Sequence, residues 1–132
     1  MILVDTSVLI DYLKGTENTK TGLFDEILDK SIPWGISALT YVELLQGAKS
    51  EREFKYLKEY LISIPLYHLN QDHDSMEKAA RFYFRARKAG LTIRSTIDIL
   101  IAQTAIDHDL YLLHNNSDYD MLASVIHELK IY

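Results

Sequence analysis

The stretch ILVDTSVLID, residues 2–11, decides how the fold begins. Its first three residues are apolar, which is typical of a buried strand, and the pattern predicts a strand over residues 1–5. The run ends at Asp5, is followed by hydroxyls at Thr6 and Ser7, and then becomes apolar at helical spacing up to Gly15. We therefore expect a strand, a carboxylate and a short helix over residues 6–15, closed by the glycine.

The same reading along the chain predicts strands alternating with helices, and therefore an α/β fold with a central, largely parallel sheet flanked by helices. The helix from residue 40 would begin with Thr40 and Glu43 in capping-box spacing. One face of the following helix would carry Phe54, Leu57, Leu61 and Ile64, with Tyr56 and Tyr60 beside it. The predicted strands are 34–39, 66–69, 110–114 and 128–132; the helices are 22–31, 40–49, 50–64, 74–90 and 95–109, with a polar connection at 17–21 and a short helix within loop 115–125.

Composition limits the class of protein. A chain of 132 residues with 48% hydrophobic residues and no repeat or long linker is expected to form one domain over residues 1–132. Having no cysteine, it can form neither a disulfide nor a thiolate zinc site. We find no basic region before the first apolar stretch and no run that could span a bilayer, so we expect a cytoplasmic protein with no membrane contact.

Four acidic residues stand near predicted element boundaries. Asp5 ends the first strand, Glu43 lies a few residues beyond the second, and Asp118 follows the strand at 110–114. Asp98 is surrounded by isoleucine and leucine, a costly place for an unpaired charge. In open parallel sheets, ligands bind beyond the carboxyl ends of the strands, so these residues are candidates for one site.

Two interpretations of these acids stay open at this point. Each taken singly resembles a helix cap, which contributes about 1 kcal/mol. If all four converge, a pair of carboxylates ~5 Å apart repels by about 3 kcal/mol at an effective dielectric of 20. A divalent cation would offset that repulsion, and oxygen ligands favour Mg²⁺, with Mn²⁺ as the alternative, over zinc.

Four segments carry a resemblance to a known family. ILVDTSVLIDYL, ISALTYVELLQGA, STIDILIAQTAI and LLHNNSDYDMLA resemble, in order, the four acidic motifs of the PIN domain, and most resemble VapC-type toxins of prokaryotic type II toxin–antitoxin systems. The resemblance implies a PIN-like fold and identifies Asp5, Glu43, Asp98 and Asp118 as the catalytic acids of a metal-dependent endoribonuclease. Thr6 and Asn115 match its supporting polar positions. His114 stands where many members carry Thr or Ser.

By this resemblance, Asp5 and Asp98 would bind Mg²⁺ directly, and water would attack the RNA phosphodiester to leave a 5′-phosphate and a 3′-hydroxyl. A cognate antitoxin peptide and a homodimer are the expected partners. Basic residues follow one helical face or lie just beyond it, and a solvated surface is their default interpretation, with contact to the RNA backbone as the alternative: Arg81, Arg85, Lys88 and Arg94.

Two other functions are compatible with the pattern. A PIN nuclease of RNA processing or quality control would have the same acidic site, but we expect such enzymes to carry an accessory module. A non-catalytic Mg²⁺-binding regulatory domain, similar to a response-regulator receiver, would cluster its acids early in the chain. Here the acids are spread from residue 5 to residue 118, which argues against the receiver-like domain.

Overall fold

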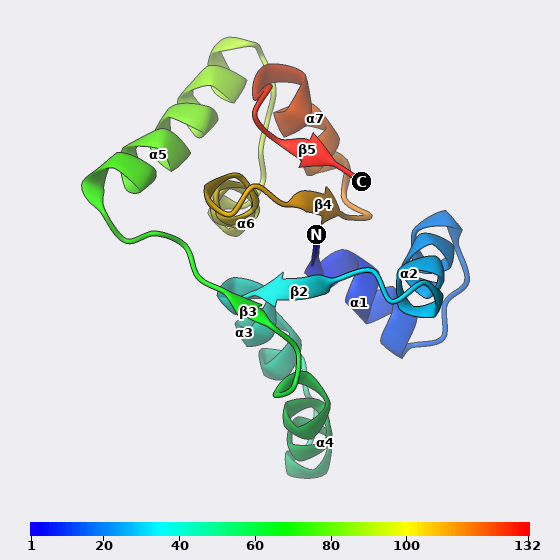
Figure 1. Cartoon of the computed structure of the whole chain (residues 1–132). Helices are drawn as coiled ribbons and strands as arrows, with labels where there is room; N and C mark the ends of the chain where they lie inside the picture. Colours follow the sequence, from blue (N-terminus) through cyan, green and yellow to red (C-terminus); the bar gives the residue numbers. More distant parts are fainter.

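A sheet of five parallel strands forms the centre of the computed structural model, which describes all residues 1–132 (Figure 1). The strands lie in the order β3-β2-β1-β4-β5. All four pairings are parallel, which confirms the predicted sheet. The strands are short: β1 Ile2–Val4, β2 Trp34–Ser37, β3 Leu66–Tyr67, β4 Tyr111–Leu113 and β5 Lys130–Ile131.

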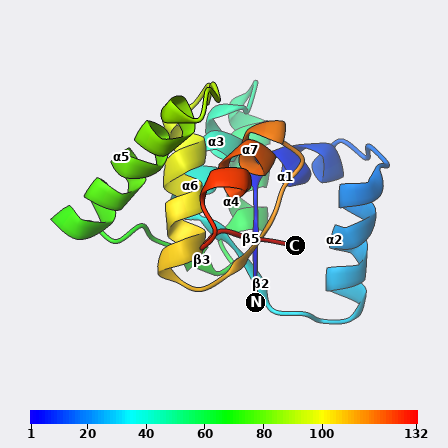
Figure 2. The ribbon, with the colours of Figure 1, turned by 90° about the horizontal axis from the view of Figure 1, so that it is seen from above.

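Helices cover both faces of this sheet, as the view from above shows (Figure 2). Leu3 of β1 packs in one core with α5, α6 and α7, whereas Ile2 and Val4 pack in a second core with α1 to α4. The alternation follows from the pleat, which points successive side chains to opposite faces. The helices are α1 Thr6–Leu13, α2 Thr19–Asp29, α3 Ala38–Gln46, α4 Glu51–Leu61, α5 His73–Lys88, α6 Thr96–Asp107 and α7 Ser117–Val125.

The centre of the sheet is a topological switch point. From β1 the chain builds outward through β2 and β3 on one side, and it returns to add β4 and β5 on the other. Val4 pairs with Leu113, and the amide of Asp5 donates to the carbonyl of Leu113 at 2.9 Å. The segments that follow β1 and β4 therefore start side by side, which is where open parallel sheets bind ligands.

Two predicted helix starts are wrong, both because a capping residue lies earlier. Ser37, at the end of β2, caps α3 by accepting from the amide of Leu39, so Thr40 lies inside the helix and does not cap it. Asn18 caps α2 in a reciprocal capping box with Thr21, so α2 takes in most of the stretch predicted as a connection. A local hydrogen bond decided each boundary.

The helix predicted over residues 50–64 ends at Leu61. Leu61 is buried, but Phe54 is 41% exposed and Tyr56 is 64% exposed. α4 extends away from the sheet below α3, so Phe54 is exposed, whereas Leu61 lies in the second core and Ile64 packs against that core (Figure 1). None of the helices has both the length and the apolar character that crossing a membrane requires.

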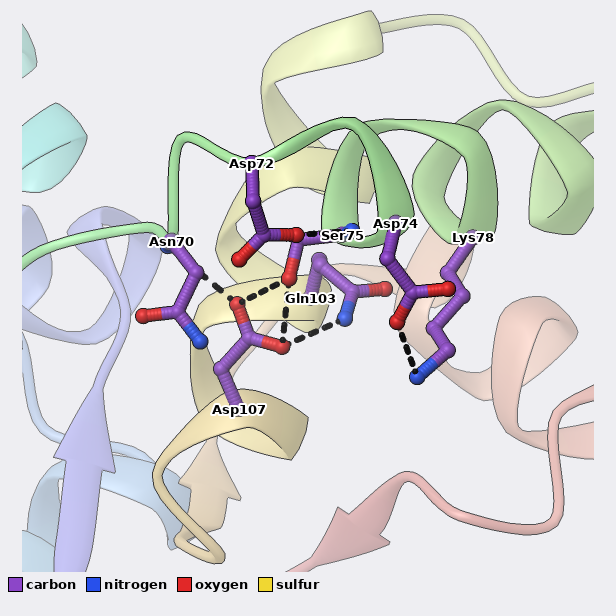
Figure 3. Close-up of polar contacts among 7 residues, drawn as sticks. All are labelled: Asn70, Asp72, Asp74, Ser75, Lys78, Gln103 and Asp107. Atoms are coloured by element: carbon purple, nitrogen blue, oxygen red, sulfur yellow. Dashed lines mark hydrogen bonds and ion pairs between the residues drawn. The ribbon is translucent and has the colours of Figure 1, made fainter.

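A polar network joins the start of α5 to the end of α6 (Figure 3). The carboxylate of Asp107 accepts from the Ser75 hydroxyl at 3.2 Å, from Gln103 Nε2 at 2.7 Å and from the amide of Asn70 at 3.3 Å. Asp72 caps α5 through the amide of Ser75. The network fixes α5 against α6, which carries one of the four acids.

Candidate active site

Asp5 follows β1 directly and caps α1. Its Oδ2 accepts from the amide of Ser7 at 2.9 Å and from the Ser7 hydroxyl at 2.6 Å. Its Oδ1 accepts from the hydroxyl of Tyr119 at 2.9 Å. The side chain is buried, so the capping interpretation holds for Asp5 and also explains how a buried carboxylate is held in one orientation.

Glu43 reaches the same place from α3. Its Oε1 accepts from the hydroxyl of Thr6 at 2.7 Å, a contact that spans 37 residues of sequence. Because Ser37 is the cap of α3, the carboxylate of Glu43 is not needed at its own helix terminus. Thr6 is the residue after Asp5, so this hydrogen bond brings the second acid beside the first.

Asp98 lies in the first turn of α6, whose cap is Ser95. The side-chain Nδ2 of Asn116 donates to Asp98 Oδ2 at 3.1 Å. Burial raises the pKa of Asp98 to about 6, and the neighbouring charges of Asp5, Asp118 and Glu43 add to the shift, although the hydrogen bond from Asn116 opposes it. The carboxylate therefore lies within the field of the other three acids.

Asp118 is buried in the first turn of α7, which is capped by Asn116. Its Oδ2 accepts from the amide of Arg94 at 3.2 Å and from Arg94 Nε at 3.3 Å. Its Oδ1 lies 3.3 Å from Arg94 Nη2 but accepts no well-directed hydrogen bond. Asp118 therefore keeps an acceptor oxygen without a full partner.

The structure thus brings together all four acids that the sequence singled out. Tyr119 shows the same convergence, because burial raises the pKa of its hydroxyl and the charges of Asp5, Asp98 and Glu43 raise it further. Asp5 lies in the connection after β1, and the other three acids lie on helices: Glu43 on α3, Asp98 on α6 and Asp118 at the start of α7. For Glu43, Asp98 and Asp118 a capping role does not explain the position of the carboxylate.

This set of donors fits a hard divalent cation. It offers carboxylate oxygens and an orphaned buried oxygen on Asp118, and the pKa of Asp98 is raised first by burial and then by the charges of the other three acids. No three acidic or histidine side chains already surround a common point at metal-binding distance. The carboxylates are gathered and restrained, and they do not form a closed cage.

The supporting residues only partly match the sequence prediction. Thr6 contacts Glu43, but the side chain of Asn115 donates to Asp11 at 3.0 Å and does not contact any of the four acids. The next residue, Asn116, contacts Asp98. Asn116 was not predicted, although an asparagine two residues before Asp118 at the start of a helix is a typical cap.

Two further residues of the site were not predicted. The Ser7 hydroxyl was noted in the sequence but given no role at the site, although a serine two residues after an aspartate often bonds to it in a turn or cap. Tyr119 gave no signal, since a tyrosine between Asp118 and Asp120 does not indicate which group its hydroxyl will contact. Its ring is in the core, and only the tertiary contact of its hydroxyl with Asp5 gives it a role at the site.

His114 follows β4 and is buried. Its Nδ1 accepts from the amide of Asn116 at 3.2 Å, which assigns the ring proton to Nε2. Nε2 has no hydrogen-bond partner and lies 3.6 Å from Asp120. Burial lowers the pKa of His114, so the neutral ring supports the loop that presents Asn116.

The predicted basic residues do not form one patch. Arg94 lies at the acidic site, where it pairs with Asp118. Arg81 and Arg85 line a separate hollow of about 390 Å³ together with Asp74, Glu77 and Glu128. The ammonium group of Lys88 lies over the ring of Phe84, 5.2 Å from its centroid. The basic face of α5 is therefore mixed in charge and distinct from the four carboxylates.

Comparisons with known proteins identify the family and the fold. The family model of the PIN domain matches residues 2–125. A VapC ribonuclease of Mycobacterium bovis and ribonuclease VapC11 of Mycobacterium tuberculosis are each 29% identical over 126 residues, which is 95% of this chain and 93% of each relative.

Solved structures show the same fold at lower identity. VapBC2 from Rickettsia felis, bound to a DNA fragment from its promoter, superposes with a TM-score of 0.75 at 20% identity and covers 100% of this chain and 98% of that one. DNA-bound VapBC from Salmonella typhimurium gives 0.75 at 19% identity, over 99% and 96% of the chains. VapC20 of Mycobacterium tuberculosis, described as a toxin that cleaves the sarcin-ricin loop, gives 0.64 at 16%, over 96% and 97%.

Proposed function

This chain belongs to the PIN domain family, and from that premise we propose that it is a divalent-metal-dependent endoribonuclease that acts as the toxin of a toxin–antitoxin pair. The observation that carries the proposal is the convergence of Asp5, Glu43, Asp98 and Asp118 beyond the carboxyl ends of β1 and β4. The pKa of Asp98, raised to about 6 mainly by burial and further by the charges of the other three acids, supports this convergence. The whole chain, residues 1–132, acts as a single PIN domain.

In this proposal Asp5 and Asp98 bind the cation, which is Mg²⁺ or, as an alternative, Mn²⁺. When bound, the ion supplies Lewis-acid activation of water and neutralises charge on the phosphodiester. Glu43 and Asp118 complete the acidic set and accept protons or hydrogen bonds from water at its edge. Thr6 holds Glu43, and Asn116 holds Asp98, so two of the acids are oriented before substrate binds.

The substrate is RNA, and water is the attacking group, so the products end in a 5′-phosphate and a 3′-hydroxyl. Basic side chains contact the phosphate backbone outside the acidic site, since a phosphate cannot approach four carboxylates without cations nearby. The candidates are Arg81, Arg85, Lys88 and Arg94. For Arg94 this requires that its guanidinium leave Asp118, and its side chain is 71% exposed. We expect the substrate RNA to be cytoplasmic.

An antitoxin helix and a second copy of the chain are the proposed partners. Exposed apolar side chains on α3 and α4 offer anchors for the helix: Val42, Phe54 and Tyr56. A basic side chain of the antitoxin would pair with the acids, as Arg94 pairs with Asp118. It would thereby compete with the cation.

The test compares purified wild-type protein with Asp5→Asn and Asp98→Asn on RNA, with added Mg²⁺, with Mn²⁺ and with a chelator. We expect cleavage only with metal and only by the wild type, while both variants keep the wild-type circular dichroism spectrum. Asp25→Asn, an exposed acid of α2, is the matched control and should cleave normally. Metal-dependent cleavage by Asp5→Asn or Asp98→Asn would contradict the proposal.

Growth separates the toxin from a processing nuclease. Induction of the wild type alone should arrest growth, whereas induction of Asp5→Ala should not, and sequencing of RNA ends in the two cultures should show new 5′-phosphate ends only with the wild type. If purified protein cleaves RNA but induction leaves growth unchanged, a role in RNA processing or quality control replaces the toxin.

A further inference from the structure

The carboxylate of Asp5 is the most fully engaged of the four acids. An ionised carboxylate has roughly four acceptor positions, two on each oxygen. Ser7 fills both positions on Oδ2, with its amide at 2.9 Å and its hydroxyl at 2.6 Å. Tyr119 fills one position on Oδ1 at 2.9 Å. One acceptor position, on Oδ1, is left.

Both hydroxyls that hold Asp5 depend on the segment after β4. The amide of Asn115 donates to the Ser7 hydroxyl at 2.9 Å, so the proton of that hydroxyl is directed to Asp5. Tyr119 is the third residue of α7, the helix that Asn116 caps. The end of β1 supplies the acid, and the segment after β4 fixes its orientation.

The hydroxyl of Tyr119 can act only as a donor to Asp5. Its side chain is fully buried, and its ring packs against His114 at a centroid distance of 5.0 Å. A phenol carries one hydrogen, and the carboxylate of Asp5, which can only accept, lies 2.9 Å from it. A phenol in this place has no other hydrogen-bond partner in the structure.

We propose that Tyr119 is a positioning residue for Asp5, whose carboxylate, held by Tyr119 on one oxygen and by Ser7 on the other, has a single acceptor position on Oδ1 for a divalent cation. The inference rests on the proposed function, which it deepens. It follows that Asp5 binds the ion through one oxygen, since chelation by both oxygens would require a hydrogen bond from Ser7 to break.

The experiment measures Mn²⁺ binding to the full-length protein by isothermal titration calorimetry, without RNA. Hydrogen-bonding partners of a metal ligand typically change metal affinity by about 10–100-fold when removed, so Tyr119→Phe should weaken Mn²⁺ binding by that factor. Tyr111→Phe, which removes a hydroxyl from an exposed ring on β4, is the matched control and should bind as the wild type does.

A second variant tests the other side of the carboxylate. Ser7→Ala should also weaken Mn²⁺ binding, and in the double variant the loss should be smaller than the product of the two single losses, because both residues orient one carboxylate. If Tyr119→Phe does not fold, as judged by circular dichroism, Ser7→Ala alone decides. If Tyr119→Phe folds and binds Mn²⁺ with wild-type affinity, the inference is overturned. If Tyr119→Phe does not fold, wild-type affinity in Ser7→Ala overturns it.

The two proposals fail in different ways. If the wild type binds Mn²⁺ and cleaves RNA while Tyr119→Phe does both equally well, only the positioning role fails. If the wild type neither binds Mn²⁺ nor cleaves RNA with any divalent metal, the proposed function fails and the role of Tyr119 fails with it.

Discussion

The guanidinium of Arg94 lies against the buried carboxylate of Asp118, with Nη2 3.3 Å from Oδ1, while the backbone amide of Arg94 donates to Oδ2 at 3.2 Å. The arginine side chain is 71% exposed, whereas that of the aspartate is 2% exposed. A cation at the rim therefore compensates a charge that lies inside the site. It is the only basic side chain in an ion pair with any of the four acids.

Removing this side chain should destabilise the metal-free protein. We expect Arg94→Ala to lower the free energy of unfolding by on the order of 1 kcal/mol, because a buried carboxylate loses a charged partner that is itself largely solvated. The measurement is urea unfolding in chelator, with Arg52→Ala, an exposed arginine of α4, as control. Added Mn²⁺ should reduce the difference between the two variants, and equal stability of both in chelator would contradict the prediction.

The stability of the metal-free protein should depend on the protonation of Asp98. Its pKa is raised from 3.8 in the unfolded chain to about 6 in the fold, so the folded state binds the proton more tightly. The resulting stabilisation is fully present below about pH 3.8 and is lost as the pH rises through 6. Because Asp98 is only partly buried and solvent screens its charge, we expect a change in the free energy of unfolding on the order of 1 kcal/mol.

Asp98→Asn isolates this effect from all other titrations. In chelator, the stability of the variant relative to the wild type should increase between pH 4.5 and pH 7, since only the wild type develops the repelled charge. Urea unfolding at both pH values gives the difference. A relative stability that does not change between them would show that Asp98 titrates in its ordinary range.

The basic residues of α5 are proposed to contact the RNA backbone. Each of Arg81→Ala and Arg85→Ala, made in the inactive Asp98→Asn background, should weaken RNA binding and reduce the slope of log affinity against log salt by about 1. Lys14→Ala, an exposed lysine after α1, should leave the slope unchanged. Because acids line the same hollow, an unaltered slope in both arginine variants would assign this face to solvent.

The chain should form a homodimer, seen by light scattering as twice its 15.3 kDa mass. Tyr83→Asp should shift the protein toward the monomer, because it places a charge in an apolar hollow of about 310 Å³ between α5 and α6. A wild-type protein that is only monomeric at micromolar concentration would contradict this. The residues of the hollow are Met76, Ala79, Ala80, Tyr83, Thr96, Ile99 and Leu100.

Antitoxin binding should depend on the exposed apolar side chains of α3 and α4. Phe54→Asp should weaken the complex with the co-expressed antitoxin and leave the dimer intact, whereas Tyr83→Asp should do the reverse, so the two variants control each other. The complex should also weaken less with salt than RNA binding does, since buried contacts are screened less than exposed phosphate contacts. Pull-down at increasing salt measures both effects.

Much of this could be read from the sequence. The apolar run before Asp5, the alternation of strand and helix patterns and the glycines at 15 and 90 predict the α/β fold, and both glycines do adopt the positive φ that closes a helix. Asp98 was singled out because a carboxylate in an apolar helix conflicts with its local surroundings, and such conflicts mark a functional site. The other three acids were singled out because they stand near strand ends, and the resemblance to the PIN domain joined the four into one site.

Tertiary structure decided the rest. Ser37 takes the cap that Thr40 was expected to supply, and this leaves Glu43 for Thr6, 37 residues away. Asp5 and Tyr119 are 114 residues apart, and no local pattern relates them. The sequence determines which residues conflict with their neighbours, because that conflict is local. Which partner resolves the conflict depends on how the strands and helices pack, because a hydrogen bond requires two groups at one place and is indifferent to their separation along the chain.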